Sequence, residues 1–278
     1  MKFTGEKFIL IAGPCAIESE EICMQVAEKL SRIRGQRSDL EIVFKGSIDK
    51  ANRSSGKSFR GIGIGKGLEI LGKIRSRFSM AVTTDFHSPE QAKIIGKAVD
   101  IIQIPAFLCR QTDMLQAAAE ACEVVSVKKG QFLSPWDMRH VVEKLRTFGA
   151  RKILQMERGT SFGYGSLVVD MRSFQILHEN NCPVIYDLTH SLQLPGMGAE
   201  TTRGAREFAD TLARAAIGAG IDGLFIEVHP NPPQAQCDAE TQLPLKGLEE
   251  RLDAYLQLHL ARKKCQRSKF PMAMDEKY

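Results

Sequence analysis

The sequence predicts a single α/β domain folded as a (β/α)8 TIM barrel. Short apolar or β-branched runs alternate with amphipathic stretches along the whole chain, and eight such pairs can be counted. The length of 278 residues, with 43% hydrophobic content, suits a barrel of about 250 residues. Strands that alternate with helices pair in parallel, because a parallel partner is reached only through a crossover. Eight near-equal units favour closure of the sheet.

The expected strands are the short runs rich in Ile, Val, Leu and Phe. They lie at residues 8–15, 42–47, 81–86, 101–107, 124–129, 152–158, 183–190 and 223–230. The amphipathic stretches between and after them predict helices at residues 20–33, 66–77, 89–97, 112–121, 135–148, 167–178, 203–219 and 245–260. The barrel is therefore expected to span residues 1–262. Residues 263–278 are polar and charged, and we expect them to form a disordered tail.

An open doubly wound sheet is the alternative architecture, and it usually carries a nucleotide-binding fingerprint. The glycine-rich stretch RGIGIGKG at 60–67 fails the G-x-G-x-x-G pattern, because Lys66, Leu68 and Ile70 occupy the place of the third glycine. It also lacks the GK[ST] ending of a P-loop. The barrel is therefore favoured.

Composition indicates which kinds of partner and which cellular compartment to expect. The net charge of +5 comes from 38 basic and 33 acidic residues, too small an excess for a nucleic-acid-binding surface but suited to small anions. Seven cysteines, an odd number without a C-x-x-C pair, indicate a reducing compartment. The apolar run before Gly13 is shorter than a signal-peptide core or a membrane span. We expect a cytoplasmic protein that binds neither nucleic acid nor membranes.

Polar side chains gather where the predicted strands end, which is where barrels of this type place their active sites. They are Cys15, Lys45, Asp85, Gln103, Lys128, Glu157, Arg158, Asp187, His190, Glu227 and His229. Converging cations such as Lys45, Lys128 and Arg158 repel one another unless an anion lies among them. The cluster therefore predicts a phosphate or carboxylate ligand.

The loop after the second strand suits a phosphate monoester. It carries Lys50, Asn52, Arg53 and Ser54, which combine the planar donor fork of arginine with neutral donors. A charged surface turn would have the same composition, so this alternative stays open.

Cys15, His190, Glu227 and Asp238 form a candidate divalent-metal set, since thiolate, imidazole and carboxylate are all ordinary ligands. Three of them end strands one, seven and eight, and strands one and eight are neighbours in a closed barrel. Asp238 follows strand eight and could reach back. A purely structural Cys15 remains the alternative at this point.

Two other reaction types, a hydrolase and a Schiff-base aldolase, have partial support in the sequence. The sequence GTSFG at 159–163 matches a hydrolase nucleophile elbow, but Asp187 and His190 share one strand end, and Ser161 stands three residues beyond Arg158. That arrangement disfavours a hydrolase. A Schiff-base aldolase using Lys128 is the second alternative, because the cations around an inward lysine depress its pKa.

A series of motifs resembles the 3-deoxy-D-manno-octulosonate 8-phosphate synthase family over residues 8–260. The motifs are IAGPCAIES (11–19), FKGSIDKANRSS (44–55), IIQIPAFLCRQTD (101–113), VKKGQF (127–132), RGTSFGYGSLVVDM (158–171), YDLTHS (186–191) and GLFIEVHPNP (223–232). The resemblance implies condensation of phosphoenolpyruvate with D-arabinose 5-phosphate and water. The products would be 3-deoxy-D-manno-octulosonate 8-phosphate, for lipopolysaccharide sugar biosynthesis, and inorganic phosphate.

The resemblance also implies residue roles. Phosphoenolpyruvate would be bound by Lys45, Lys50, Gln103, Lys128 and Arg158. Arabinose 5-phosphate would be bound by Asn52, Arg53, Ser54 and Arg110, the last reaching a neighbouring subunit of a homotetramer. The catalytic residues would be Lys128, Asn52 and His190.

Cys15 stands where metal-independent members of that family carry asparagine. The resemblance therefore implies the metal-dependent type, with Cys15, His190, Glu227 and Asp238 as ligands of iron, zinc or manganese. Gly46, Ile48 and the loops at 61–67 and 195–208 depart from the family pattern, which bears on loop conformation and not on the ligands.

Two rival functions remain. The related 3-deoxy-D-arabino-heptulosonate 7-phosphate synthases use erythrose 4-phosphate and share the GPC-x-x-ES opening, but their phosphate loop reads closer to K-P-R-T-S than to the K-A-N-R-S-S found here. A non-catalytic barrel that binds metal or sugar phosphate is the other rival.

Overall fold

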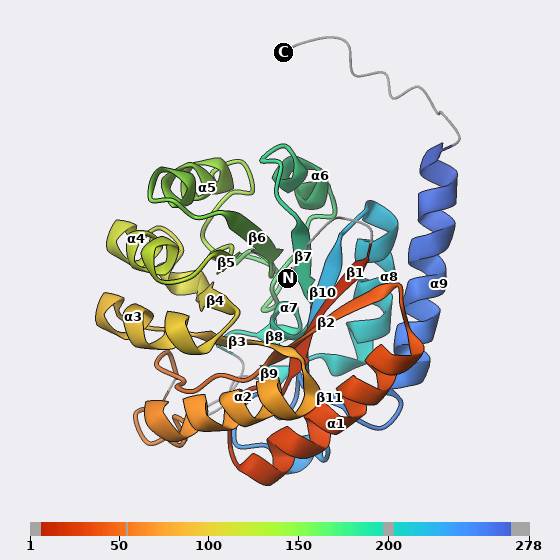
Figure 1. The fold of residues 1–278 in the computed structure, drawn as a ribbon. Helices are drawn as coiled ribbons and strands as arrows, with labels where there is room; N and C mark the ends of the chain where they lie inside the picture. Colours follow the sequence, from red (N-terminus) through yellow and green to blue (C-terminus); the bar gives the residue numbers. More distant parts are fainter. Residues whose placement is uncertain (1–6, 54, 197–202, 268–278) are drawn as a thin grey trace.

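The computed structural model describes residues 7–53, 55–196 and 203–267, which form a closed (β/α)8 barrel (Figure 1). Each barrel strand pairs in parallel with the next, and β1 also pairs with β10, which closes the sheet. The strands are β1 (Phe8–Gly13), β2 (Leu40–Lys45), β3 (Ala81–Asp85), β4 (Ile101–Ile104), β5 (Val124–Lys128), β6 (Lys152–Glu157), β7 (Val184–Asp187) and β10 (Gly223–His229). The predicted fold class is confirmed.

Helices form the outer ring seen in Figure 1. They are α1 (Glu20–Gln36), α2 (Ile64–Phe78), α3 (Pro89–Ala98), α4 (Thr112–Ala121), α5 (Met138–Thr147), α6 (Arg172–His178), α8 (Ala209–Ala219) and α9 (Leu248–Arg267). Their apolar faces pack on the outward-facing side chains of the strands in one large core. None of the helices in the described part of the chain combines the length and apolar character of a membrane span.

Short elements lie in the connections that follow β7 and β10. They are α7 (Leu188–Ser191), β8 (Gln193–Leu194), β9 (Arg203–Gly204) and β11 (Leu243–Pro244). β8 and β9 pair antiparallel, and β11 pairs with the end of β10.

A second apolar core fills the inside of the barrel. It consists of Ile9, Ile11, Val43, Ile101, Val124, Leu154, Met156, Ile185 and Phe225. Because side chains alternate along a strand, the residue two positions further on also faces inward. In this way Val43 is followed by Lys45, and Phe225 by Glu227, at the C-terminal end of the barrel.

The structure corrects several predicted boundaries. Helix α6 starts at Arg172 and not at 167, because Val168 pairs with Thr160 in an antiparallel bridge that keeps the chain extended. The helix predicted from 203 starts at Ala209, because 203–204 pair as β9. The strand predicted at 183–190 ends at Asp187, and His190 lies in α7. Helix α9 continues through Arg267, beyond the predicted domain end at 262, and 268–278 lie outside the described residues.

Candidate active site

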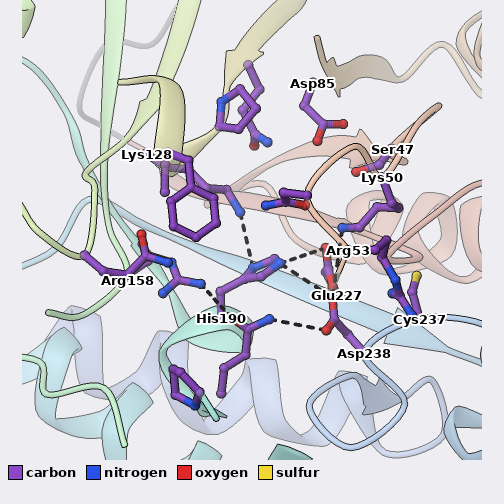
Figure 2. Close-up of a pocket in the computed structure, with 18 of the residues that line it drawn as sticks. Ser47, Lys50, Arg53, Asp85, Lys128, Arg158, His190, Glu227, Cys237 and Asp238 are labelled. Atoms are coloured by element: carbon purple, nitrogen blue, oxygen red, sulfur yellow. Dashed lines mark hydrogen bonds and ion pairs between the residues drawn. The ribbon is translucent and has the colours of Figure 1, made fainter. Parts of the chain in front are cut away.

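A cavity of about 340 Å³ lies at the C-terminal ends of the barrel strands. Most of the sequence-predicted site residues line it: Lys45, Lys50, Asn52, Arg53, Gln103, Lys128, Arg158, His190, Glu227 and Asp238. Figure 2 labels several of them, including Lys128, His190 and Glu227. Among the predicted residues that the structure describes, Cys15 and Arg110 are not part of this lining. Cys15 is fully buried, whereas Arg110 is exposed. Ser54 lies outside the described residues.

The turn after β1 places Cys15. A Cβ at Gly13 would lie 1.7 Å from the Lys45 carbonyl oxygen, so only glycine allows β1 and β2 to approach this closely. The Lys45 ammonium donates to the carbonyl oxygens of Pro14 (3.3 Å) and Cys15 (2.6 Å), which holds the turn over the strand ends. The Cys15 amide donates to Gln242 Oε1 at 3.0 Å.

Three of the four predicted metal ligands come together. Single ligand atoms of Cys15, Glu227 and Asp238 all lie within 4.8 Å of one another, and Cys15 Sγ is 3.1 Å from Asp238 Oδ2. His190 is not a member of this group but borders it, with Nε2 3.6 Å from Glu227 Oε1 and 4.0 Å from Asp238 Oδ2. Glu227 Oε2 is buried without a hydrogen-bond partner among the described residues. An unsatisfied carboxylate oxygen beside a thiol fits a divalent transition-metal ion.

Burial and charge together set the ionisation of this group. Burial would raise the pKa of Glu227, but Lys45, 2.5 Å away, and then His190 hold it well below its usual range. Burial would lower the pKa of Lys45, but Glu227 and then Cys15 and Asp85 together raise it above its usual value. Burial raises the pKa of the Cys15 thiol, and a hydrogen bond with Cys237 and the charge of Asp238 raise it further. The thiol therefore keeps its proton unless a cation lies beside it.

Lys128, Asp187 and His190 form a second buried group. Lys128 Nζ lies 2.6 Å from Asp187 Oδ2 and 3.2 Å from His190 Nδ1, and Asp187 Oδ1 accepts from the His190 amide at 3.0 Å. Burial lowers the pKa of Lys128, against the opposing effect of Asp187. Figure 2 shows His190 between Lys128 and the two carboxylates Glu227 and Asp238. Asp187 thus orients the imidazole so that Nε2 faces these carboxylates.

The remaining polar lining is suited to an anion. Arg158 is buried, and its Nη2 donates to Gln193 Oε1 at 2.7 Å, whereas Nη1 has no partner in the described part of the chain. Burial lowers the pKa of Arg158. Arg158 lines one cavity with Lys45, Lys50 and Lys128. Cations and unmet donors in a buried cavity carry a free-energy cost that an anionic ligand would remove.

The loop after β2 forms the rim of the cavity. Asn52 is exposed and Arg53 half-buried, and Arg53 Nη2 donates to the Gln236 carbonyl oxygen at 3.5 Å. These residues line the cavity on the side of the Asp238 loop. Arg110 lies between β4 and α4 and does not line the cavity.

Several lining residues were given no specific role by the sequence, among them Ser47, Asp85, Gln193 and Cys237. Asp85 could have been found, because it ends a predicted strand, and its Oδ1 is buried without a partner among the described residues. Cys237 is next to the predicted ligand Asp238 in the sequence, which is a weaker indication that it lines the site. No sequence pattern indicates Gln193, because its position depends on the pairing of β8 with β9.

Known proteins are similar over nearly the whole chain. The model of the DAHP synthetase I family matches residues 2–263. The 2-dehydro-3-deoxyphosphooctonate aldolase of Desulfotalea psychrophila is 49% identical over 258 residues, which is 93% of this chain and 92% of the relative. The protein of the same name from Trichlorobacter lovleyi is 51% identical over 244 residues, covering 88% and 89% of the two chains. That from Francisella tularensis is 46% identical over 259 residues, covering 93% and 94%. The chain belongs to the DAHP synthetase I family and, within it, to the family of the 2-dehydro-3-deoxyphosphooctonate aldolases.

Proposed function

We propose that this chain condenses phosphoenolpyruvate with D-arabinose 5-phosphate and water, giving 3-deoxy-D-manno-octulosonate 8-phosphate and inorganic phosphate. The observation that carries the proposal is one cavity that joins a buried cationic lining to the Cys15, Glu227 and Asp238 group. The names of the relatives support the same reaction.

Phosphoenolpyruvate would occupy the buried part of the cavity. Arg158 and Lys128 would face its phosphate, and Lys45, Lys50 and Gln103 would hold the rest of the molecule. Nη1 of Arg158, a donor without a partner among the described residues, supports this placement. Arg158 and Lys128 would stabilise the charge that develops on the leaving phosphate.

Arabinose 5-phosphate would enter from the rim. Arg53 and Ser54 would bind its phosphate, Asn52 would contact the sugar, and Arg110 would reach the phosphate of a neighbouring subunit. This binding mode would direct the aldehyde toward the buried enol carbon. That carbon attacks the aldehyde, water adds at the enol-ether carbon, and phosphate leaves by carbon–oxygen cleavage.

Cys15, His190, Glu227 and Asp238 would hold a divalent ion, iron, zinc or manganese. Such an ion supplies Lewis acidity when bound. The chain itself would orient His190 through Asp187 and pair Lys128 with the same carboxylate.

Phosphate release tests the reaction directly. It should occur from phosphoenolpyruvate with arabinose 5-phosphate and not with erythrose 4-phosphate, and chelation should abolish it. Preference for the four-carbon sugar would favour the heptulosonate synthase alternative. Release with neither sugar, with metal added, would favour a non-catalytic barrel.

The variant Cys15→Asn tests the ligand role. It should fold normally by circular dichroism and shift the metal dependence, because asparagine is what the metal-independent relatives carry. Activity of the variant in chelator would support an exchangeable site. Complete inactivity even with added metal would contradict it.

A homotetramer in the cytoplasm completes the proposal. The loops after β4 and β5 carry three large exposed side chains, Phe107, Phe132 and Trp136, and Arg110 follows Phe107 on the first of these loops. Exposed aromatic groups of this kind are enriched at protein interfaces. Light scattering should give a mass about four times the 30.9 kDa of the chain, and a monomer would overturn this part.

A further inference from the structure

The side chain of Gln193 touches both halves of the site. Its Oε1 accepts from Arg158 Nη2 at 2.7 Å, and its Nε2 donates to Asp238 Oδ1 at 3.2 Å. Only this orientation of the amide satisfies both neighbours, because arginine only donates and a charged carboxylate only accepts. Figure 2 shows Arg158 and Asp238 on different sides of His190.

The backbone around Gln193 is fixed to the loop that carries Asp238. Gln193 pairs with Gly204 across β8 and β9, and the Gly204 amide donates to Glu240 Oε2 at 3.0 Å. A Cβ at Gly204 would lie 2.2 Å from Thr241 Cγ2, so glycine allows this close packing. The hairpin and the Asp238 loop therefore form one packed unit.

The two neighbours of Gln193 each keep one atom for a ligand. Arg158 Nη1 has no partner among the described residues and lies in the cationic part of the cavity. Asp238 Oδ2 lies 3.1 Å from Cys15 Sγ, within the candidate metal group. Gln193 thus binds one atom of each group, Arg158 Nη2 and Asp238 Oδ1, and does not occupy Arg158 Nη1 or Asp238 Oδ2.

We propose that Gln193 is a positioning residue that couples anion binding at Arg158 to divalent-cation binding at Cys15, Glu227 and Asp238. This rests on the proposed function for the identity of the two ligands. An anion on Nη1 fixes the guanidinium, the amide then fixes the carboxylate, and Oδ2 is held toward Cys15. When the second ligand binds, the Gln193 side chain and its two neighbours are already ordered. Each ligand therefore raises the affinity for the other by the same factor.

The test measures binding without turnover. Free Mn²⁺ is followed by electron paramagnetic resonance, with and without phosphoenolpyruvate, and phosphoenolpyruvate affinity is measured with and without Mn²⁺. In the unaltered protein each ligand should tighten the other by about fivefold or more. In Gln193→Met, Mn²⁺ should bind about 10–100-fold more weakly, a typical loss when a ligand's hydrogen-bond partner is removed, and phosphoenolpyruvate should no longer change it.

Two further variants separate coupling from damage to the fold. Gln193→Asn keeps the amide but is one methylene too short to reach both partners, so coupling should again be lost. Arg203→Gln alters an exposed ion pair of the same hairpin with Glu240 (3.7 Å) and should keep the coupling.

Coupling that persists in both Gln193 variants would overturn the inference. So would an unaltered protein that releases phosphate and binds both ligands without any mutual effect. Failure of the proposed function would give a different result. The unaltered protein would then release no phosphate from phosphoenolpyruvate, but inorganic phosphate, used in place of phosphoenolpyruvate, would still change the Mn²⁺ affinity.

Discussion

Two layers inside the barrel, two residues apart on each strand, differ completely in chemistry. The lower layer is the apolar core of Val43, Phe225 and their neighbours. The upper layer is the lining of the cavity, which includes Lys45 and Glu227. The same strands supply both, because alternate residues point inward.

The layers are stabilised in different ways. Apolar burial in the lower layer stabilises the fold without a partner. Charges in the upper layer are costly to bury and are kept as pairs, Lys45 with Glu227 and Lys128 with Asp187. Stability should therefore reside mainly in the lower layer and activity in the upper one, so mutations in the two layers should have separable effects.

Arg158→Met should have the largest effect, and it should lower activity without lowering stability. Loss of a preorganised donor to a charged group costs about 10²–10³-fold in rate, so kcat/KM for phosphoenolpyruvate should fall by that order. Thermal stability should stay level or rise, because the cost of burying the guanidinium charge is removed. Steady-state kinetics and a thermal melt check both parts.

The exposed Arg151→Met, which breaks a surface pair with Glu123, is the matched control and should change neither property. An Arg158 variant that loses stability without losing activity would reverse the assignment of the upper layer.

Leu154→Ala should show the opposite pattern. Truncation of a buried leucine costs about 2–5 kcal/mol, and for a domain of this size each kcal/mol lowers Tm by roughly 2–4 °C. Leu154 is 1% exposed in the lower layer, so Tm should fall while kcat/KM below the transition stays near the original value. A large loss of kcat/KM at unchanged Tm would mean that the two layers are not independent.

Sequence periodicity predicts the layered barrel well. The alternation of strands and helices predicts the fold. The positions near the strand ends predict Lys45, Gln103 and Glu227 as cavity residues, because both predictions depend only on the local sequence pattern. The start of α6 was missed because the bridge between Thr160 and Val168 overrides helical patterning at 167–171.

The site was less predictable where it depends on distant pairing. Cys15 and Asp238 lie more than 200 residues apart in the chain, and their contact follows from β1 pairing with β10, which the barrel hypothesis supplies. Gln193 depends on a two-residue hairpin whose strands are too short to leave a pattern. Asp187 lies in the second half of the strand predicted at 183–190, but only the structure reveals its contacts with Lys128 and His190.

The smallest effect concerns the other end of the barrel, where a titratable group is buried without a partner. His259 of α9 is 5% exposed and packs against Phe8 with the rings tilted (4.8 Å between ring centres), and neither ring nitrogen has a hydrogen-bond partner among the described residues. Burial, then the charges of Lys263 and Arg262, lowers its pKa from 6.5 to about 4. The cavity end pairs its charges, whereas this end keeps its histidine neutral.

A histidine whose pKa is lower in the folded state binds its proton more readily when unfolded. Stability should therefore fall as the pH drops below the unfolded value of 6.5 and level off below about 4. Between pH 8 and pH 5 this amounts to about 2 kcal/mol. Urea unfolding at the two pH values should show that His259→Leu removes this part of the pH dependence, whereas His140→Gln, at an exposed site, does not. If the His259 variant and the unaltered protein show equal pH dependence of stability, burial does not keep the imidazole neutral. The two ends of the barrel would then differ only in the paired charges of the cavity.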